Sequence, residues 1–262
     1  MTSELDLLID LHIDAERQGP GSDEVTRRAI TLAGLRALSG LEIADIGSGT
    51  GASTFVLAED LDARVTAVDF LPAFLERLDH EARQRDVADR ITTLSASMDE
   101  LAFEPQSFDV IWSEGAIYNM GFAAGVRAWR EFLKPGGVLA VSEITWLTDQ
   151  RPAELEMHWA EEYPEIATAS AKIAILESAG YTPIGYFPLP ASCWLDHYYQ
   201  PMQERFTVFL ERHGHSAGAR AIVDAERHEM GLYEQFSSFV SYGFYIATRT
   251  ADCAVVVPSP RV

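Results

Sequence analysis

The chain has 262 residues, of which 47% are hydrophobic, so it is long and apolar enough to bury one large core. Its 40 acidic residues against 20 basic ones give a net charge of -20, which repels phosphate backbones and anionic lipid headgroups. Composition therefore argues against nucleic acid as a substrate or partner and against binding to a membrane surface.

The amino terminus indicates no export or membrane anchoring. Residues 1–6 lack the basic start of a signal peptide, and no apolar run in the sequence approaches the length of a membrane span. The two cysteines, Cys193 and Cys253, are too few for a disulfide framework and do not have the spacing of metal ligands. We therefore expect a cytoplasmic protein without a bound metal. The oligomeric state is left open.

Residues 1–40 are expected to form amino-terminal helices. Apolar spacing predicts an amphipathic helix over Glu4–Glu16. Gly19-Pro20-Gly21-Ser22 then predicts a turn whose serine can cap the following helix. Two roles are open to this turn: a hinged lid over a ligand, or a simple connection between helices.

Strands and helices then alternate. Apolar segments separated by amphipathic helices indicate a parallel sheet covered on both faces, which is an α/β fold. The predicted strands are Glu42–Ile46, Arg64–Phe70, Arg90–Ala96, Phe108–Ser113 and Gly137–Trp146.

Beyond Trp146 helical patterns become more frequent. No repeat and no linker divides the chain, so we expect a single domain over residues 1–262. We expect the helices and the sixth strand within residues 148–243 to cap the carboxyl edge of the sheet and to shape an acceptor site, with residues 244–250 as the last strand. The predicted elements are helices over Ala153–Tyr163, Ile166–Ala179, a segment around Met202–Phe209 and one around Ile222–Phe239, and strands over Tyr181–Leu189 and Phe244–Arg249.

The glycine-rich segment after the first predicted strand carries the functional signal. Gly47, Gly49 and Gly51 alternate in the sequence, and Asp45 stands two residues before the first of them. Glycine lets the backbone turn sharply and bring N–H groups against a ligand before a helix begins. A dinucleotide-binding fingerprint has the spacing G-x-G-x-x-G, whereas this loop reads G-x-G-x-G, which favours a different nucleoside cofactor.

Asp69 ends the second predicted strand, eighteen residues after Gly51. A carboxylate at this place can accept hydrogen bonds from both hydroxyls of a ribose. The alternative is an aspartate that only caps the following helix. Its distance from the glycine loop favours the ribose role.

Together these segments resemble the motifs of class I S-adenosylmethionine-dependent methyltransferases. Ser95–Phe103 resembles the family's adenine-binding segment, although Ser97 stands where an aspartate is common and Ala102 replaces a proline. The Ser97 hydroxyl or Met98 is expected to take the place of that carboxylate, or Met98 is part of the core. Ser107–Asn119 and the turn at Lys134–Gly137 resemble further family landmarks in the expected order.

The stretch Gly19–Glu143 resembles a group of small-molecule (UbiE-like) bacterial methyltransferases with GPGS and WSEGAIYN segments. The resemblance implies a Rossmann-like sandwich with a seven-stranded, mostly parallel sheet, an antiparallel last strand and extra helices at the carboxyl edge. It implies S-adenosylmethionine as methyl donor and S-adenosylhomocysteine as product, with residues 41–147 as the cofactor-binding core. The implied cofactor contacts are Asp45, Gly47, Ser48, Gly49, Thr50, Gly51, Asp69, Phe70, Ser97, Met98, Glu114 and Gly115.

The chemistry implied is in-line methyl transfer to a small-molecule acceptor without a metal. Positioning of the reactants supplies most of what such a transfer needs. An acceptor hydroxyl or amine also needs a group that removes its proton, for which His197, Tyr118 and Glu114 are candidates. For Glu114, a contact with the bound methyl donor is favoured over a role as a base. The acceptor, and the atom methylated, are left open.

Two other functions compete with methyl transfer. The first is a noncatalytic protein that binds S-adenosylmethionine or S-adenosylhomocysteine as a sensor, which the sequence alone does not distinguish from an enzyme. The second is an NAD(P)-dependent oxidoreductase, which the glycine spacing disfavours.

Overall fold

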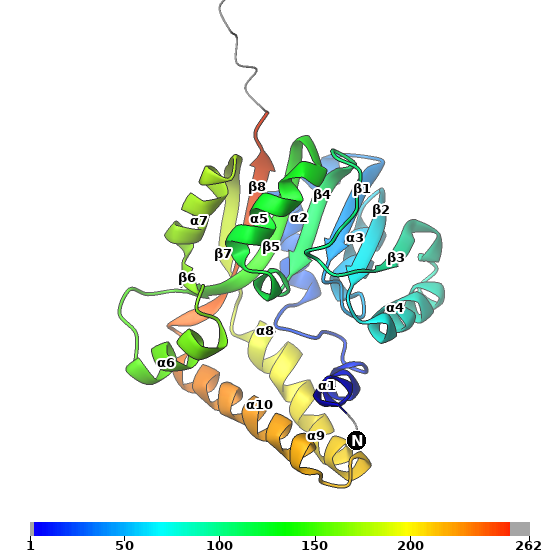
Figure 1. Cartoon of the computed structure of the whole chain (residues 1–262). Coiled ribbons are helices and arrows are strands. Elements are labelled where there is room, and N and C mark those ends of the chain that lie inside the picture. Colours follow the sequence, from blue (N-terminus) through cyan, green and yellow to red (C-terminus); the bar gives the residue numbers. More distant parts are fainter. Residues whose placement is uncertain (1–2, 252–262) are drawn as a thin grey trace, which may run out of the picture.

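One sheet of eight strands forms the centre of the computed structural model, which describes residues 3–251 (Figure 1). Seven strands follow the order β3-β2-β1-β4-β5-β8-β7, and the two-residue β6 pairs with β5. The strands are β1 (Leu41–Ile46), β2 (Ala63–Asp69), β3 (Ile91–Ser95), β4 (Phe108–Glu114), β5 (Leu133–Trp146), β6 (Ala167–Thr168), β7 (Tyr181–Pro188) and β8 (Val240–Arg249).

Helices cover both faces of this sheet and one end of it (Figure 1). Those of the two faces pack on two separate hydrophobic cores, one with α2, α3 and α4 and one with α5 and α7. The helices are α1 (Glu4–His12), α2 (Asp23–Leu32), α3 (Ala52–Asp60), α4 (Pro72–Gln84), α5 (Phe122–Trp129), α6 (Ala153–Glu162), α7 (Ala169–Ser178), α8 (Ser192–Trp194), α9 (Gln200–Arg212) and α10 (Ala217–Phe236).

The central strand β1 shows why a sandwich forms. Side chains alternate between the two faces of a strand, so a strand buried on both faces is apolar at nearly every position. Ile43 of β1 packs into the core under α2 and α3, whereas its neighbours Ala44 and Ile46 pack into the core under α5 and α7. All three side chains are fully buried.

Strand β8 lies antiparallel between β5 and β7, and the remaining neighbours in the sheet are parallel. The sheet is therefore mostly parallel with an antiparallel last strand, as expected, and the short β6 adds an eighth strand to the seven expected. The Rossmann-like fold is confirmed.

Several predicted boundaries were wrong. The last strand begins at Val240 rather than Phe244, because Val240–Gly243 pair with the end of β5. The helix before it correspondingly ends at Phe236, short of Phe239. The turn expected at Lys134–Gly137 lies inside β5 as an irregularity in its pairing with β4.

Two helices also differ from the prediction at their ends. Helix α1 ends at His12, four residues before Glu16. The helix expected from Ile166 begins only at Ala169, because Ala167 and Thr168 pair with the end of β5 as β6.

Helices α1, α8, α9 and α10 lie beyond the carboxyl ends of the parallel strands (Figure 1). A π-helical turn over Leu195–Tyr199 joins α8 to α9. The Trp194 indole N–H donates to the Ser241 hydroxyl at 3.1 Å, which ties this helical cap to β8. Within residues 3–251, the helices are all too short or too polar to cross a membrane.

Candidate active site

The glycine loop after β1 adopts backbone that only glycine accommodates easily. Gly47 has a φ of 76° and Gly49 a φ of 55°. A Cβ atom on Gly47 would lie 2.3 Å from the Cβ of Ala116, and one on Gly49 would lie 2.3 Å from the Oε1 of Gln18. The amides of Gly47 and Ser48 donate to the Val68 carbonyl at 2.8 and 2.9 Å, which anchors the loop to the end of β2.

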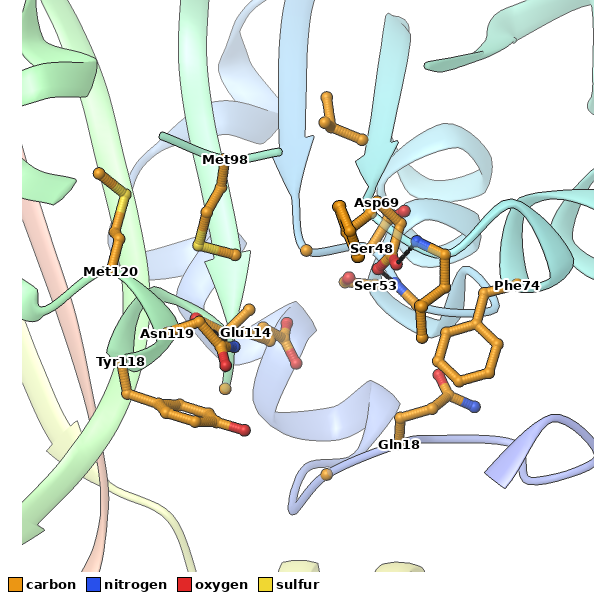
Figure 2. A pocket seen from close by; sticks show the side chains of 18 of the residues that line it. Gln18, Ser48, Ser53, Asp69, Phe74, Met98, Glu114, Tyr118, Asn119 and Met120 are labelled. Atoms are coloured by element: carbon orange, nitrogen blue, oxygen red, sulfur yellow. Dashed lines mark hydrogen bonds between the residues drawn. The ribbon is translucent and has the colours of Figure 1, made fainter. Parts of the chain in front are cut away.

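A cavity of about 510 Å³ opens between this loop and the ends of β2 and β4 (Figure 2). Open α/β sheets bind ligands at this edge. Figure 2 shows Asp69 and Ser48 on one side of it and Tyr118 and Met120 on the other. The lining residues that the sequence singled out are Gly47, Ser48, Gly49, Asp69, Phe70, Ser97, Met98, Glu114, Gly115 and Tyr118.

Asp69 is oriented by the backbone on both sides of it. Its Oδ2 accepts a hydrogen bond from the Gly49 amide at 2.8 Å, and its Oδ1 accepts one from the Leu71 amide at 2.9 Å. Burial raises the pKa of this carboxyl, and the backbone hydrogen bonds oppose that rise. Each oxygen keeps a further lone pair with which to accept a hydrogen bond from a ligand in the cavity.

Asp45, Thr50 and Gly51 do not line the cavity, so their role as direct contacts stays a prediction. Asp45 is fully buried and accepts hydrogen bonds from Ser53 at 2.8 Å and Thr54 at 2.7 Å, so it fixes the start of α3. Burial raises the pKa of Asp45 to about 7. Thr50 and Gly51 belong to the same turn, and Thr50 pairs with the side chain of Gln18.

The segment after β3 supplies a carboxylate that the sequence reasoning missed. Ser97 and Met98, which the sequence singled out, line the cavity. Asp99, which it did not single out, also lines the cavity. The Ser97 hydroxyl donates to the Asp99 carboxylate. The Met98 carbonyl accepts from the Trp129 indole at 3.1 Å. A carboxylate thus lies at the cavity two residues after Ser97, which stands where the family commonly has an aspartate, and the adjacent acidic pair Asp99-Glu100 is its signal in the sequence.

An amino-terminal segment closes one side of the cavity. Its Arg17 and Gln18 were missed, whereas Gly19 and Pro20 belong to the turn for which a lid over a ligand was one of two expected roles. Arg17, Gln18, Gly19 and Pro20 are all lining residues. The Gln18 side chain bridges to the glycine loop, because its Oε1 accepts from the Thr50 amide at 2.9 Å and its Nε2 donates to the Thr50 hydroxyl at 2.9 Å. The sequence marks Arg17–Pro20 only by their position directly before Gly21-Ser22.

Glu114, at the end of β4, is held by three donors. Its Oε2 accepts from the Arg17 guanidinium at 2.9 Å. Its Oε1 accepts from the Thr26 hydroxyl at 2.7 Å and the Trp112 indole at 2.9 Å. Both members of the ion pair are buried, with 8% of each side chain exposed. Glu114 therefore joins the amino-terminal segment to β4, and a role as a base would require this ion pair to break.

The two predicted catalytic residues fall in different places. Tyr118 lines the cavity, and 42% of it is exposed. His197 lies on the exposed side of the π-helical turn and is not a lining residue, so its role as a proton acceptor stays a prediction without a contact to the cavity. Within the part of the chain that the structure describes, no three His, Cys, Asp or Glu side chains form a group that could hold a metal ion.

Comparison with known proteins identifies the class. Residues 43–137 match a family model described as a methyltransferase domain. Erythromycin 3''-O-methyltransferase of Saccharopolyspora erythraea is 31% identical over 133 residues, covering 50% of this chain and 43% of that protein. Demethylmenaquinone methyltransferase of Clavibacter sepedonicus is 32% identical over 127 residues, covering 48% and 49%. The chain thus spans about half the length of these relatives or less.

Solved structures share the fold across nearly the whole chain. A methyltransferase from Geobacter sulfurreducens, solved with S-adenosyl-L-homocysteine, has a TM-score of 0.80 at 19% identity and covers 94% of this chain and 99% of its own. The cyclase SpnF has a TM-score of 0.70 at 19% identity and covers 91% and 86%. Residues 43–137 therefore match a methyltransferase domain, and the chain as a whole has the Rossmann-like fold that the motifs predicted. One fold neighbour being a cyclase means that the reaction must be argued from the site.

Proposed function

We propose that this chain binds S-adenosylmethionine in the cavity and transfers its methyl group to a small-molecule acceptor. One observation carries the proposal: the glycine loop after β1, Asp69 after β2 and Gly115 after β4 converge on a single cavity at the carboxyl edge of the sheet. Its volume, about 510 Å³, is in the range of small-molecule sites.

The residues around the cavity fit the parts of the donor. Gly47 and Gly49 pack so closely against Ala116 and Gln18 that neither position has room for a side chain. We propose that the amino-acid part of the donor lies against the backbone of this loop. Asp69 presents oriented carboxylate oxygens to the ribose hydroxyls. Met98 and Asp99 are proposed to contact the adenine, Met98 through its side chain and Asp99 through its carboxylate.

When bound, S-adenosylmethionine supplies a methyl group that is already activated on a sulfonium. The chain then needs to bind both reactants in line and to exclude water, which is what positioning by a closed cavity provides. The amino-terminal segment fits that role, because Arg17 and Gln18 fasten it over the cavity through Glu114 and Thr50. Tyr118 is the predicted catalytic group that remains at the cavity, and its hydroxyl is available to an acceptor.

The acceptor is proposed to be a small molecule rather than nucleic acid, because of the net charge of -20. The amino-terminal segment closes one side of the cavity, so a macromolecular substrate would require it to move.

Two measurements test the proposal. Isothermal titration should show S-adenosylmethionine and S-adenosylhomocysteine binding to the wild-type chain. The Asp69→Ala variant should bind both roughly tenfold to a hundredfold more weakly, since hydrogen bonds to a charged group contribute about 1.5–3 kcal/mol. Asp69→Asn, which keeps one acceptor oxygen, should fall between them.

Turnover of methyl-labelled donor across a panel of metabolites then separates an enzyme from a protein that only binds. Donor binding without label transfer to any acceptor would favour the noncatalytic alternative. No donor binding to the folded wild-type chain would exclude the proposal.

A further inference from the structure

The segment between α1 and α2 crosses one side of the cavity without regular secondary structure. We call residues 13–21 the strap. Four of them, Arg17–Pro20, line the cavity. On one side of the strap, α1 is tied to the cap, because the Leu11 carbonyl accepts from the Arg205 Nε at 3.1 Å. On the other side, Ser22 caps the start of α2. The strap is therefore fixed at both ends, and whether it can open depends on what holds its middle.

The side chain of Gln18 holds the middle of the strap to the glycine loop. Its Oε1 accepts from the Thr50 amide at 2.9 Å and lies 3.1 Å from the Thr50 hydroxyl. Its Nε2 donates to that hydroxyl at 2.9 Å and to the carbonyls of His12 and Ala15 at 3.3 and 3.2 Å. Both N–H groups of the carboxamide are thus engaged by the protein. This favours a role in holding the strap over a direct hydrogen bond to the methyl donor.

Thr50 is the matching group on the glycine loop. Only 6% of it is exposed, and it does not line the cavity. Within residues 3–251, its hydroxyl has hydrogen-bond partners only in the strap, namely Gln18 and the Ala15 carbonyl at 3.4 Å. We call Gln18 and Thr50 the latch. It joins the strap to the loop that is proposed to face the amino-acid part of the methyl donor.

The strap is held more firmly at Arg17. Its guanidinium pairs with Glu114 at 2.9 Å and with Asp23 at 3.1 Å, and only 8% of the Arg17 side chain is exposed. Gly21 packs against the same group, since a Cβ atom there would lie 2.9 Å from the Arg17 Nη1. Separating a buried ion pair costs several times more than breaking a hydrogen bond between neutral groups. Of these two attachments, the latch is therefore the one that opens more easily.

Gln18–Pro20 lie between two fixed points of the strap, Arg17 and Gly21. Gly19 faces open space, because a Cβ atom there would meet nothing within 4 Å. Glycine also has the widest choice of backbone conformations. These three residues can therefore move away from the glycine loop while Arg17 keeps its ion pair.

We propose that the latch opens each time the methyl donor enters the cavity or its product leaves, and that Gln18–Pro20 then move while Arg17 stays paired with Glu114. This inference rests on the proposed donor site and names how exchange at that site is controlled. Lids over active sites open in microseconds to milliseconds and set the turnover rate of many enzymes. Because the latch bonds only to the protein, its loss lowers the barriers to entry and to departure alike.

Rate constants distinguish a latch from a contact with the ligand. Surface plasmon resonance of the immobilised wild-type chain measures how fast S-adenosylhomocysteine associates and dissociates. Gln18→Ala and Thr50→Val each remove hydrogen bonds of the latch, and each should raise both rate constants by about twofold to tenfold. The dissociation constant is the ratio of the two rate constants and should change by less than about twofold.

Gln84→Ala is the matched control. Gln84 is an exposed glutamine on α4, and within the described residues its side chain bonds only to His80 of the same helix. Its loss should leave both rate constants unchanged. The double variant Gln18→Ala/Thr50→Val should exchange S-adenosylhomocysteine about as fast as Gln18→Ala alone, because the two side chains act as one unit.

Two results would overturn the inference. Faster dissociation of Gln18→Ala with unchanged association would make Gln18 a contact of the ligand. Unchanged rate constants in folded Thr50→Val would remove the latch, and this test holds even if Gln18→Ala does not fold. Failure of the proposed function looks different, because S-adenosylhomocysteine would then not bind the wild-type chain at all, whereas failure of the latch leaves that binding intact.

Discussion

At the scale of single residues, alanine substitutions at Gly47 and Gly34 distinguish the cost of a positive φ from the cost of a steric clash. Both have a positive φ, 76° and 71°, but a Cβ on Gly34 would meet nothing within 4 Å, whereas one on Gly47 would meet Ala116. Gly34→Ala should lower the free energy of unfolding by about 1 kcal/mol through backbone strain alone and leave donor binding unchanged.

Gly47→Ala should lower the free energy of unfolding and also weaken donor binding, because the loop that faces the cavity must shift. If the whole overpacking cost of about 1–3 kcal/mol opposes donor binding, the affinity should fall by about fivefold to a hundredfold. Titration calorimetry and urea unfolding of both variants provide the check. Equal donor affinities for the two variants would show that the contact between Gly47 and Ala116 is unimportant.

A second residue-scale prediction concerns pH. Burial raises the pKa of Asp45 from its ordinary 3.8 to about 7, so between these values the folded chain holds a proton that the unfolded chain has released. The stabilisation by neutral Asp45 is complete below pH 3.8 and is lost as the pH rises through about 7. The side-chain amide of the Asp45→Asn variant does not titrate. Urea unfolding should therefore show this variant gaining stability relative to wild type as the pH rises across this window. Parallel pH profiles would contradict the assignment.

The glycines and Asp69 could be predicted from the sequence because their requirements are local: a turn after a strand, and an acid at the end of the next one. Arg17 and Asp99 could not. Arg17 reaches Glu114 across 97 positions of sequence, and only packing of the amino-terminal segment on β4 brings them together. His197 lies away from the cavity, and nothing in the sequence shows which side of a helical turn faces the cavity.

At the scale of elements, the amino-terminal segment is joined to β4 through the buried ion pair between Arg17 and Glu114. Arg17→Leu should cost about 3–5 kcal/mol in the free energy of unfolding, because it leaves a buried carboxylate without its cation. Glu114→Gln in the Arg17→Leu background should recover part of that loss, since glutamine is neutral and can still accept from Thr26 and Trp112.

Urea denaturation of the two single variants and the double variant measures this coupling. Strict additivity of the three free-energy changes would mean that the two side chains do not interact. Loss of donor binding in a folded Arg17→Leu variant would in addition place the amino-terminal segment in the donor site.

Element type was predictable wherever burial was uniform. The parallel strands are apolar on both faces, so β1 and β4 stand out in the sequence. The residues at which the elements begin and end could not be predicted. Val240–Gly243 became strand because they pair with β5, and Ala167 and Thr168 became β6 for the same reason. Such pairing depends on residues far along the chain and leaves no local signal.

At the scale of the whole molecule, an acidic chain holds a cavity between the carboxyl edge of its sheet and the amino-terminal segment. We propose that the loops at the ends of β1, β2 and β4 contact the donor and that residues outside them distinguish acceptors. This division explains why the fold and cofactor class could be inferred from motifs while the acceptor could not. The glycine loop, Asp69 and the WSEGAIYN segment lie within residues 43–137, which match the family model, whereas the GPGS turn and the cap lie outside that range.

The most direct test is a crystal structure of the chain with S-adenosylhomocysteine bound. The ribose hydroxyls should lie within hydrogen-bond distance of the Asp69 carboxylate, the amino-acid part against Gly47 and Gly49, and the sulfur should face Gly115. Density for the ligand outside this cavity, or within it but with the ribose away from Asp69, would contradict the proposed donor site.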